Sequence, residues 1–591
     1  MLYGELVGVY ERLEATSKRL EKTFLLSEFL KTVQSAELEQ VLLLAQGKVF
    51  PDWDQRVIGM DVKLLLKALS RATGASAEKI EELWKNSGDL GTVAVELTKK
   101  KSQVTLFSQP LTIKKVFENL QKLATLEGAG TVDRKIQLAS ELLTSATPQE
   151  AKYILRSILG ELRVGLGEGT VRDTIVWAFF GDRAGVKYDK TTNELAISDE
   201  ERKTYDEYVT LIQEAYDVAN DFAQVARLAK EKGEAGLQNI SLMPGKPVKV
   251  MLFQKAKDIT DAFSIVGKPA ALEFKYDGFR LQIHKKAGKI TLFTRRLENV
   301  TLQFPDVVQR ISKHLLGDEF IIDAEAVGVD VQTKKYLPFQ NISQRIKRKY
   351  DIEETAGKFP VEVNVFDVLF HNGHSLLKTP FAERRNLLEK NVAKVDFQIK
   401  LSEQIITDDL NEAEKFYKAS LAAGNEGIMM KNLQGIYKPG SRVGFGVKVK
   451  PTMDTLEVVI VGAEWGEGKR GQWLASFIVA VKDPETGSFV EIGRVGTGIK
   501  EKEEEGVSFA QLTQLLMPLI VEEKGREVKV RPEIVIEVDY EEIQKSPTYS
   551  SGFALRFPRL CKLREDRSAD DVNTTLDLLK LFENQRGRKV Y

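Results

Sequence analysis

The spacing of apolar residues changes along the chain from the period of a helix to the period of a strand. Over residues 1–235, apolar side chains recur every three or four positions, which predicts amphipathic helices. The clearest examples are residues 2–25, 29–44, 62–69 and 154–162. Glycine and proline separate these segments, and long two-residue alternation is absent from them. We therefore expect an all-α domain at residues 1–240.

Residues 233–247 are rich in glycine, proline and serine, which is typical of a boundary between domains. Beyond this boundary, apolar and polar positions alternate with a period of two, which predicts strands. The expected strands cover residues 270–274, 280–285, 289–294, 319–329, 361–370 and 427–431. The expected helices between them cover residues 305–316, 380–389 and 410–423. This pattern indicates an α+β domain at residues 241–450.

The last part of the chain is rich in strands and turn signals. Expected strands cover residues 456–462, 474–482, 489–495, 527–530 and 534–540, with a helix at residues 508–517. A short barrel of five strands with an inserted helix suits an OB-fold. Residues 568–582 have the pattern of a terminal helix. We expect an OB-fold domain with a C-terminal helix at residues 451–591.

Composition limits the classes of function. Lys+Arg and Asp+Glu are both 86 in 591 residues, so a surface that binds nucleic acid must be a local patch. A single cysteine, Cys561, excludes internal disulfides and a four-cysteine zinc site, and four histidines argue against a histidine-rich metal site. No apolar run reaches the about 18 residues of a membrane helix, and the N-terminus lacks the pattern of a signal peptide. We expect a cytoplasmic protein with no membrane partner.

The segment at residues 273–280, Glu-Phe-Lys-Tyr-Asp-Gly-Phe-Arg, carries the most chemistry. It predicts a strand, a turn at Gly278 and a second strand. Apolar neighbours would bury the stem of Lys275 and leave its amine beside the carboxylates of Glu273 and Asp277. Such a lysine becomes a nucleophile if desolvation or nearby cations lower its pKa. Taken alone, the segment fits a salt-bridged turn equally well.

Later strands supply the groups that a lysine facing a phosphate needs. Asp323 and Glu325 share one face of an apolar strand, where acids require partners or a metal. Phe366 can stack on a base, although alone it reads as core, and Glu426 alone reads as a loop charge. The accompanying cations are Arg280, Arg295, Arg296, Arg442, Lys448 and Lys450. Together these residues indicate nucleotidyl transfer.

In this order, the motifs resemble those of ATP-dependent DNA ligases of the archaeal and eukaryotic replicative type. Residues 275–280, Lys-Tyr-Asp-Gly-Phe-Arg, match the nucleotidyltransferase signature Lys-x-Asp-Gly-x-Arg. Further family motifs follow at residues 294–298, 323–325, 366–367, 426–431, 448–450 and 557–567. The resemblance covers essentially the whole chain. One departure is that the last motif ends Asp566-Arg567 where the family usually has Asp-Lys, which keeps the charge but changes the donor geometry.

The resemblance implies that Lys275 attacks ATP to form lysyl-AMP and releases diphosphate. AMP would then pass to the 5′-phosphate of a nick, and attack by the 3′-hydroxyl would seal the strand in DNA replication, repair and recombination. The implied ATP-binding residues are Glu273, Lys275, Arg280, Arg295, Glu325, Phe366, Arg442, Lys448 and Lys450. Glu325 and Glu426 would bind Mg²⁺ or Mn²⁺, and Arg564, Asp566 and Arg567 would help the OB-fold domain close over ATP.

The resemblance also implies that residues 46–53 and 159–172 belong to a helical DNA-binding domain. In the second segment, glycines precede a helix start that we expect Thr170 to cap, and a helix N-terminus suits a phosphate backbone. A glycine-rich turn between helices explains the segment as well. The expected DNA-binding residues are Arg163, Gly165, Gly167, Thr170 and Arg172. The partner would be nicked double-stranded DNA, bound by a monomeric, nucleoid-associated protein of a prokaryotic cell.

Residues 103–107 resemble a degenerate peptide that binds a sliding clamp. Gln103, Leu106 and Phe107 would be its contacts, although local packing of the apolar pair explains the pattern equally well. Two alternatives to a DNA ligase use the same lysine signature, namely an RNA ligase and an mRNA-capping guanylyltransferase. The large helical domain argues against both. A non-catalytic DNA-binding scaffold would leave Lys275 and the paired acids without a role.

Overall fold

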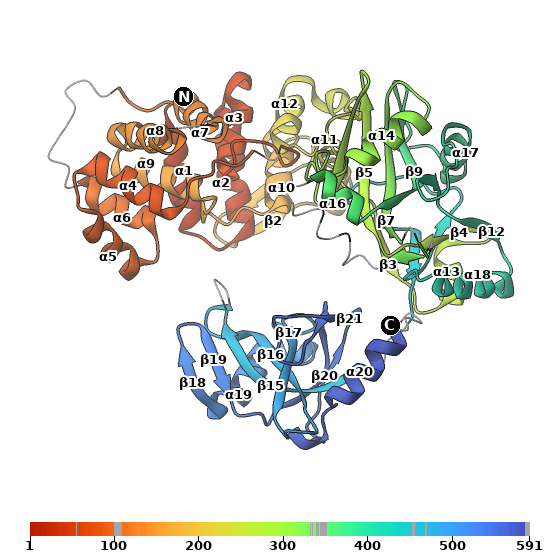
Figure 1. Ribbon diagram of the computed structural model, residues 1–591. Coiled ribbons are helices and arrows are strands. Elements are labelled where there is room, and N and C mark those ends of the chain that lie inside the picture. Colours follow the sequence, from red (N-terminus) through yellow and green to blue (C-terminus); the bar gives the residue numbers. More distant parts are fainter. Residues whose placement is uncertain are drawn as a thin grey trace.

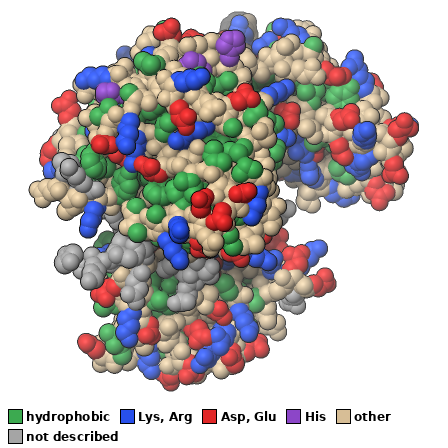
Figure 2. All heavy atoms as spheres, turned by 90° about the vertical axis from the view of Figure 1, so that its right-hand side faces the viewer, with side chains coloured by type: hydrophobic (Ala, Val, Ile, Leu, Met, Phe, Trp, Pro, Cys, Tyr) green, Lys and Arg blue, Asp and Glu red, His purple; other side chains and the backbone are tan. Residues whose placement is uncertain are grey.

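The computed structural model describes residues 1–54, 56–99, 109–126, 128, 130–330, 332–333, 335–337, 342, 345, 352–451, 455–466 and 470–585. Figure 1 shows a helical part beside an α+β part, with a strand-rich C-terminal part below them. On the face drawn in Figure 2, blue basic and red acidic side chains are interspersed, in keeping with the zero net charge.

The N-terminal part is helical, as predicted, apart from one small hairpin. Its helices are α1 (Tyr3–Glu14), α2 (Arg19–Thr32), α3 (Ser35–Ala45), α4 (Val62–Thr73), α5 (Ala77–Ser87), α6 (Leu90–Lys99), α7 (Ile113–Thr125), α8 (Thr131–Ser145), α9 (Pro148–Leu159), α10 (Glu168–Phe179), α11 (Asp199–Ala219) and α12 (Phe222–Gln238). The hairpin pairs β1 (Lys187–Asp189) with β2 (Glu194–Ala196). Gly233, with φ +57°, interrupts the regular backbone of α12 within the predicted boundary segment.

The middle part contains two sheets. The first has the order β10-β9-β7-β5-β6, with β11 beside β9 and β8 beside β7, and the second has the order β12-β4-β13-β14-β3. The first sheet comprises β5 (Phe279–Lys286), β6 (Lys289–Thr294), β7 (Phe320–Val329), β8 (Tyr336–Leu337), β9 (Val361–His371), β10 (His374–Ser375) and β11 (Ile399–Leu401). The second comprises β3 (Leu252–Lys255), β4 (Ala270–Lys275), β12 (Gln404–Thr407), β13 (Gly427–Asn432) and β14 (Arg442–Val449).

Helices cover one face of each sheet. They are α13 (Ile259–Val266), α14 (Pro305–His314), α16 (Ile352–Lys358), α17 (Phe381–Asn391) and α18 (Leu410–Ala422). Helices α14 and α17 share a buried core with the first sheet, and α13 and α18 share one with the second. Alternation along β5 places Leu281 and Ile283 in that core, so Arg280 and Gln282 face the other way. The face of each sheet that these helices do not cover can therefore carry the polar residues of a site.

The turn at residues 276–278 carries the chain from the second sheet to the first. Lys275 ends β4, and Phe279 begins β5. A Cβ on Gly278 would lie 2.6 Å from the carbonyl oxygen of Ala326 and 2.7 Å from Cγ of Glu325. Only glycine fits this close approach to β7, so the glycine of the signature is required by packing between strands.

The C-terminal part is the predicted strand-rich domain, with more strands than the pattern indicated. Its main sheet has the order β17-β16-β15-β19-β18, and β20 joins β15 to β23. The strands are β15 (Leu456–Trp465), β16 (Leu474–Lys482), β17 (Phe489–Val495), β18 (Ile520–Lys524), β19 (Glu527–Val530), β20 (Val535–Asp539), β21 (Glu542–Lys545), β22 (Phe553–Arg556) and β23 (Arg559–Leu563). The helices are α19 (Phe509–Leu516), α20 (Thr575–Asn584) and the short 3₁₀ turns η2 (Glu503–Glu505), η3 (Met517–Leu519) and η4 (Ala569–Asp571).

The expected single helix at residues 568–582 is wrong in detail. Ser568 and Asp571 cap the 3₁₀ turn η4, and a second capping box of Thr574 and Asp577 starts α20. Two consecutive N-terminal caps stop the chain from continuing as one helix, since each cap residue is extended rather than helical.

One buried ion pair fastens α17 to the first sheet. Arg384 donates from Nε to Oδ1 of Asp367 at 2.7 Å and from Nη2 to Oδ2 at 3.0 Å. The two side chains are 1% and 4% exposed. Burial alone would raise the pKa of Asp367, but Arg384 lowers it below its usual range. Asp367, which follows Phe366 in a predicted motif, is therefore a structural anchor.

We predict that Asp367→Ala destabilises the middle domain by about 3 to 5 kcal/mol, because it leaves a buried guanidinium unpaired. Scanning calorimetry of the full-length protein measures the change. The matched control is Asp396→Ala, which removes an exposed carboxylate 3.9 Å from Lys394 and should change stability by less than about 1 kcal/mol. Equal effects of the two substitutions would contradict the anchor role.

Candidate active site

The signature lysine shares one carboxylate with a second lysine. Nζ of Lys275 lies 2.7 Å from Oε2 of Glu426, and Nζ of Lys450 lies 2.5 Å from the same oxygen. The amide of Glu426 also donates to the carbonyl of Lys275 at 2.8 Å. Burial would raise the pKa of Glu426, but the two ammonium groups hold it well below its usual range. The sequence placed this amine beside Glu273 and Asp277, whereas its described ion pair is with Glu426.

A third lysine completes a positive cluster. Lys448 lies two residues before Lys450 on β14, and neighbouring β13 begins directly after Glu426. Burial lowers the pKa of Lys448, and the charges of Lys450 and Lys275 lower it further. Three ammonium groups gather here, with the carboxylates of Glu426, Glu325 and Glu541 around them. Such a group of cations suits bound phosphates.

Arg280 stands at the start of β5, on the opposite side of the signature turn. Its Nη2 lies 2.6 Å from Oδ2 of Asp323, a fully buried carboxylate on β7. The guanidinium carbon lies 5.2 Å from the ring centre of Phe366, and Nζ of Lys431 lies 5.1 Å from the same centre. Phe366 is half-buried between two cations, as expected for an aromatic side chain at the edge of a nucleotide site.

Glu273 is only 2% exposed and is held by neighbouring strands. Its Oε2 lies 2.6 Å from Nζ of Lys431, and its Oε1 accepts a hydrogen bond from Nε2 of Gln404 at 2.9 Å. Arg385 approaches the same carboxylate at 3.5 Å. Glu273 is therefore fixed two residues from Lys275 on β4, with its charge balanced inside the protein.

Glu325 lies opposite Arg280 where β7 pairs with β5. Burial raises the pKa of Glu325 to about 7, while Lys275 and Arg280 lower it and Glu426 raises it. The two carboxylates predicted to bind a metal thus interact with each other. The cations near Glu325 do not offset the effect of burial on its pKa. Among the described residues there is no group of three or more acid, histidine or cysteine ligands. Two carboxylates beside a phosphate-binding cluster fit Mg²⁺, which often completes its shell with phosphates and water.

Two predicted nucleotide-binding residues are less tightly placed. Arg295 is exposed in the turn after β6, whose last residue, Thr294, pairs with Leu281 of β5. Arg442 begins β14, and its side chain lies outside the described part of the structure. The other predicted residues of the site come from both sheets and meet around the signature turn.

Comparison with known proteins agrees with this arrangement. Family models for the DNA ligase N terminus, the ATP dependent DNA ligase domain and the ATP dependent DNA ligase C terminal region match residues 2–176, 250–450 and 470–567. A DNA ligase of Nanoarchaeum equitans is 47% identical over 589 residues, which covers 99% of each chain. The chain belongs to the ATP-dependent DNA ligase family. The predicted family, fold class and enzyme, a ligase that seals DNA nicks with ATP, are confirmed.

Two further comparisons extend this result. A DNA ligase of Thermococcus fumicolans is 44% identical to this chain over 589 residues, and the alignment covers 100% of each chain. A solved structure described as Pmar-Lig_Pre has a TM-score of 0.54 at 15% identity and covers 95% of this chain and 99% of that one. That second likeness shows the fold alone. In the described part of the ligase, no helix is long and apolar enough to cross a membrane.

The predicted closing residues of the OB-fold domain of the ligase are paired within their own domain. Arg564 binds Asp566 through Nε at 2.9 Å and Nη2 at 2.8 Å, and its Nη1 contacts Glu457. Nε of Arg567 lies 3.5 Å from Glu457. One described ion pair reaches the active-site cluster from this domain, between Glu541 and Lys450 at 3.6 Å.

The glycine-rich segment of the ligase starts α10, but Thr170 does not cap this helix. Gly167 is the N-cap, and Thr170 is buried inside the first turn. Arg163, with φ +60°, is exposed and pairs with Glu161 at 2.7 Å. Arg172 donates to Asp173 at 2.9 Å, so both arginines are already paired with carboxylates of the protein. Gly165 has φ +67°, a left-handed conformation that favours glycine, and a Cβ there would lie 2.5 Å from Nζ of Lys22.

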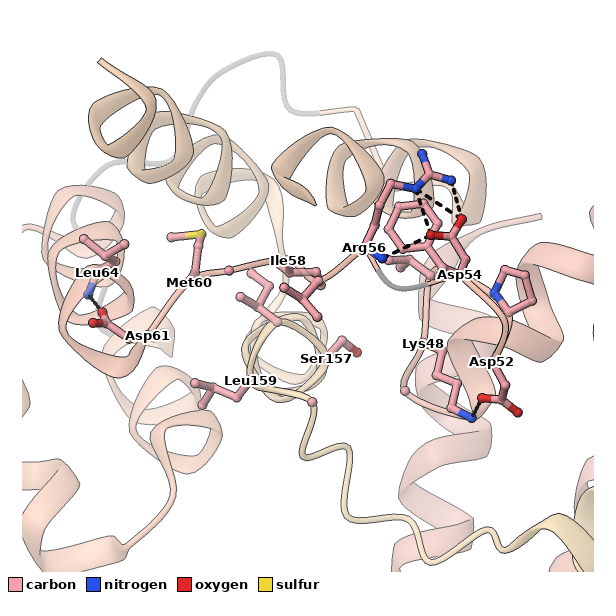
Figure 3. Close-up of a pocket in the computed structure, with 18 residues that line it drawn as sticks. Lys48, Asp52, Asp54, Arg56, Ile58, Met60, Asp61, Leu64, Ser157 and Leu159 are labelled. Carbon is pink, nitrogen blue, oxygen red and sulfur yellow. Dashed lines mark hydrogen bonds and ion pairs between the residues drawn. The ribbon is translucent and has the colours of Figure 1, made fainter. Parts of the chain in front are cut away.

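The second predicted DNA-binding segment lies next to the first. Residues 47–52, 54, 56–61, 64 and 157–160 line a hollow of about 700 Å³, shown in Figure 3. In this view Lys48 pairs with Asp52, and Arg56 pairs with Asp54 at 2.6 Å. The segments that resemble the DNA-binding region thus form one surface of the ligase. The predicted clamp contacts Gln103, Leu106 and Phe107 lie outside the described residues.

The sequence did not single out several residues that support the site. Lys431 and Gln404 hold Glu273, and Tyr437 donates a hydrogen bond to Asp323 at 2.9 Å. Lys431 belongs to the motif at residues 426–431, so the sequence could have singled it out. Gln404 and Tyr437 lie outside every quoted motif, and only the packing of the two sheets reveals their partners.

The raised pKa of Glu325 predicts a stability effect with a definite sign. A folded-state pKa of about 7 against an ordinary value of 4.5 means that ionisation of Glu325 opposes folding. The stability that the protonated carboxyl contributes is fully present below pH 4.5 and is lost as the pH rises through 7. In ligand-free protein, we predict that Glu325→Gln raises stability by about 1 to 2 kcal/mol at pH 8 and by much less at pH 5.

Calorimetry at the two pH values, without ATP or divalent metal, measures this difference. Exposed Glu383 on α17 offers the control substitution Glu383→Gln, which should show no such pH dependence. A Glu325→Gln protein that is less stable than wild type at pH 8 would show that this carboxylate is well satisfied in the ligand-free fold.

Proposed function

We propose that Lys275 is the nucleophile of the ligase and that the surrounding residues form its ATP site. The observation that carries this proposal is that Lys275 and Lys450 share the carboxylate of Glu426, while Lys448 lies close enough for the charges of both lysines to lower its pKa. Nucleophilic attack requires a neutral amine. The same positive cluster stabilises negative charge that develops on phosphate oxygens.

In the first step, Nζ of Lys275 bonds to the α-phosphorus of ATP, the bond to the bridging oxygen breaks and diphosphate leaves. The attacking amine gives up a proton, so the nitrogen of lysyl-AMP is uncharged and its phosphoryl group keeps one negative charge. In the second step, the 5′-phosphate of the nick attacks the AMP phosphorus and frees Lys275. The 3′-hydroxyl then attacks the activated 5′-phosphate, and AMP leaves as the strand is sealed.

Other residues are assigned supporting roles. Phe366 stacks on adenine, Glu273 lies near the base, and Arg280, Arg295, Arg442, Lys448 and Lys450 contact the ribose and phosphates. Glu325 and Glu426 hold Mg²⁺, or Mn²⁺, which supplies charge neutralisation at the phosphates when bound. Metal binding at Glu426 competes with its two lysine partners, so the ion pairs seen here belong to the ligand-free enzyme.

The division of labour between domains is part of the proposal. Residues 1–240 bind the duplex backbone, residues 241–450 form the adenylation domain, and residues 451–591 close over ATP through Arg564, Asp566 and Arg567. The backbone contacts carry no sequence information, which suits an enzyme that must act at any nick. We further propose a cytoplasmic, nucleoid-associated monomer of a prokaryotic cell, with residues 103–107 as its contact to a sliding clamp.

A labelling experiment tests the proposed function. The protein is incubated with Mg²⁺ and α-labelled ATP or GTP, and nicked duplex DNA is then added. We predict covalent label from ATP, discharge of the label by nicked DNA and a sealed product. Lys275→Ala should lower labelling by at least about 10³-fold, since loss of the nucleophile removes the covalent step.

Exposed Lys418 on α18 provides the control Lys418→Ala, which should label like wild type. Label taken only from GTP would favour a capping-type guanylyltransferase. Label that nicked RNA discharges and nicked DNA does not would favour an RNA ligase, and either result would overturn the proposal.

A further inference from the structure

The linker between the helical part and the adenylation domain donates hydrogen bonds to residues that lie beneath the nucleotide site. Residues 239–251 connect α12 to β3. The amide of Met251 donates to the hydroxyl of Tyr437 at 3.2 Å, and the amide of Val248 donates to Oε1 of Gln282 at 2.7 Å. The amide of Gly245 donates to Nδ1 of His284 at 2.9 Å. Three backbone amides of the linker thus donate hydrogen bonds to side chains of the adenylation domain.

These side chains converge on Asp323. The hydroxyl of Tyr437 donates to Oδ2 of Asp323 at 2.9 Å, and Nε2 of Gln282 lies 3.4 Å from Oδ1. His284 shares Oε1 of Gln282 at 3.0 Å. Burial lowers the pKa of His284 to about 3, so the ring is neutral, accepts at Nδ1 and donates from Nε2. In these hydrogen bonds, each of the named donors therefore has a matching acceptor.

Asp323 in turn holds Arg280. Nη2 of Arg280 donates to Oδ2 of Asp323 at 2.6 Å and contacts the hydroxyl of Tyr437 at 3.3 Å. Tyr437 is 3% exposed, and Asp323 is 0% exposed. Burial raises the pKa of Tyr437, and Asp323 raises it further, so the hydroxyl stays protonated and donates. Two buried groups therefore fix Nη2 of the guanidinium, whose carbon lies 5.2 Å from the ring centre of Phe366.

Apolar packing holds the linker in this position. Leu242, Val248 and Met251 share a buried cluster with Tyr437 and with residues of the first sheet. The intervening residue Lys249 points to the helical part instead, where its Nζ lies 3.1 Å from Glu168, the first residue of α10. The linker therefore has one set of contacts to the start of a predicted DNA-binding helix and another to the support of Arg280.

We propose that Tyr437 and Gln282 are positioning residues of the ligase. Through Asp323 they fix the Arg280 guanidinium for the nucleotide, and they fasten linker residues 245–251 beneath it. This inference rests on the proposed function only in that Arg280 contacts bound ATP. Tyr437 acts through Arg280 and does not touch the reacting atoms.

Tyr437→Phe tests the inference, because it removes one hydroxyl and keeps the ring. In self-adenylation assays we expect the ATP concentration for half-maximal rate to rise roughly fivefold or more, with the saturating rate changed by less than about twofold. The amide of Met251 loses its acceptor, so its hydrogen exchange should accelerate by roughly tenfold. A substitution that merely reduced the folded fraction would lower the amplitude of labelling and leave the ATP dependence unchanged.

The matched control is Tyr336→Phe, which removes a hydroxyl that donates to Glu362 at 2.7 Å in the same domain. It should change neither the ATP dependence nor the exchange of Met251. If Tyr437→Phe does not fold, Asp323→Asn replaces it in the measurement of ATP dependence. This substitution keeps the shape but removes the charge opposite Arg280, and we expect a larger rise in the ATP requirement.

Two results would overturn the inference. One is an unchanged ATP requirement in Tyr437→Phe, and the other is unchanged exchange of the Met251 amide. Either is distinguishable from failure of the proposed function, in which wild-type protein would take no label from ATP or would keep its label in Lys275→Ala. An active wild type with an unresponsive Tyr437→Phe variant would reject the positioning role alone.

Discussion

The active site depends on charges that are brought together at low solvent exposure. Lys275, Lys450 and Glu426 form a shared ion pair at the junction of two sheets, and Lys448 adds a further positive charge beside it. Such a cluster is stable only while geometry and neighbouring groups compensate for lost hydration. The fold meets this requirement by pairing β4 with β13 and β13 with β14, which brings Lys275 near Glu426 and Lys448. At the signature turn, Gly278 allows β7 of the other sheet to approach closely. The proposed nucleophile and the cations near it therefore depend on the pairing of three strands.

The two carboxylates of the cluster are in opposite electrostatic states. Glu426 has two cationic partners and a depressed pKa, whereas Glu325 has a pKa raised to about 7 by burial. A bound divalent metal with its phosphates would even out this imbalance by adding positive charge near Glu325. In the ligand-free enzyme, lysines occupy part of that role. This arrangement accounts for a site that is ordered before the nucleotide arrives.

Local patterns in the sequence predicted most of the fold because apolar period and turn residues agree over long segments. Strand β6 has the predicted bounds, and β4, β5, β7 and β9 differ from prediction by a residue or so at either end. The short strands β3, β8, β10 and β11 were missed, since two to four residues carry too little periodicity. The terminal helix was misjudged because adjacent caps, rather than apolar spacing, decide where it starts.

The site was predictable only where its residues stand in recognisable motifs. Motif order placed Lys275, Arg280, Glu325 and Glu426 together, but local reasoning put the Lys275 amine beside Glu273 and Asp277. In the fold, Glu273 is turned toward Lys431 and Gln404 instead. Alternation along a single strand cannot show which neighbour in a second sheet supplies the counter-charge. The same limit hid Tyr437, whose partners Met251 and Asp323 are more than a hundred residues away.

The most direct test of the account is to locate the AMP on the protein. Wild-type ligase is charged with ATP and Mg²⁺, digested under conditions that preserve the phosphoramide and mapped by tandem mass spectrometry. The account predicts a single AMP adduct on Lys275. An adduct on Lys448, Lys450 or any residue outside residues 273–280 would contradict the assignment of the nucleophile.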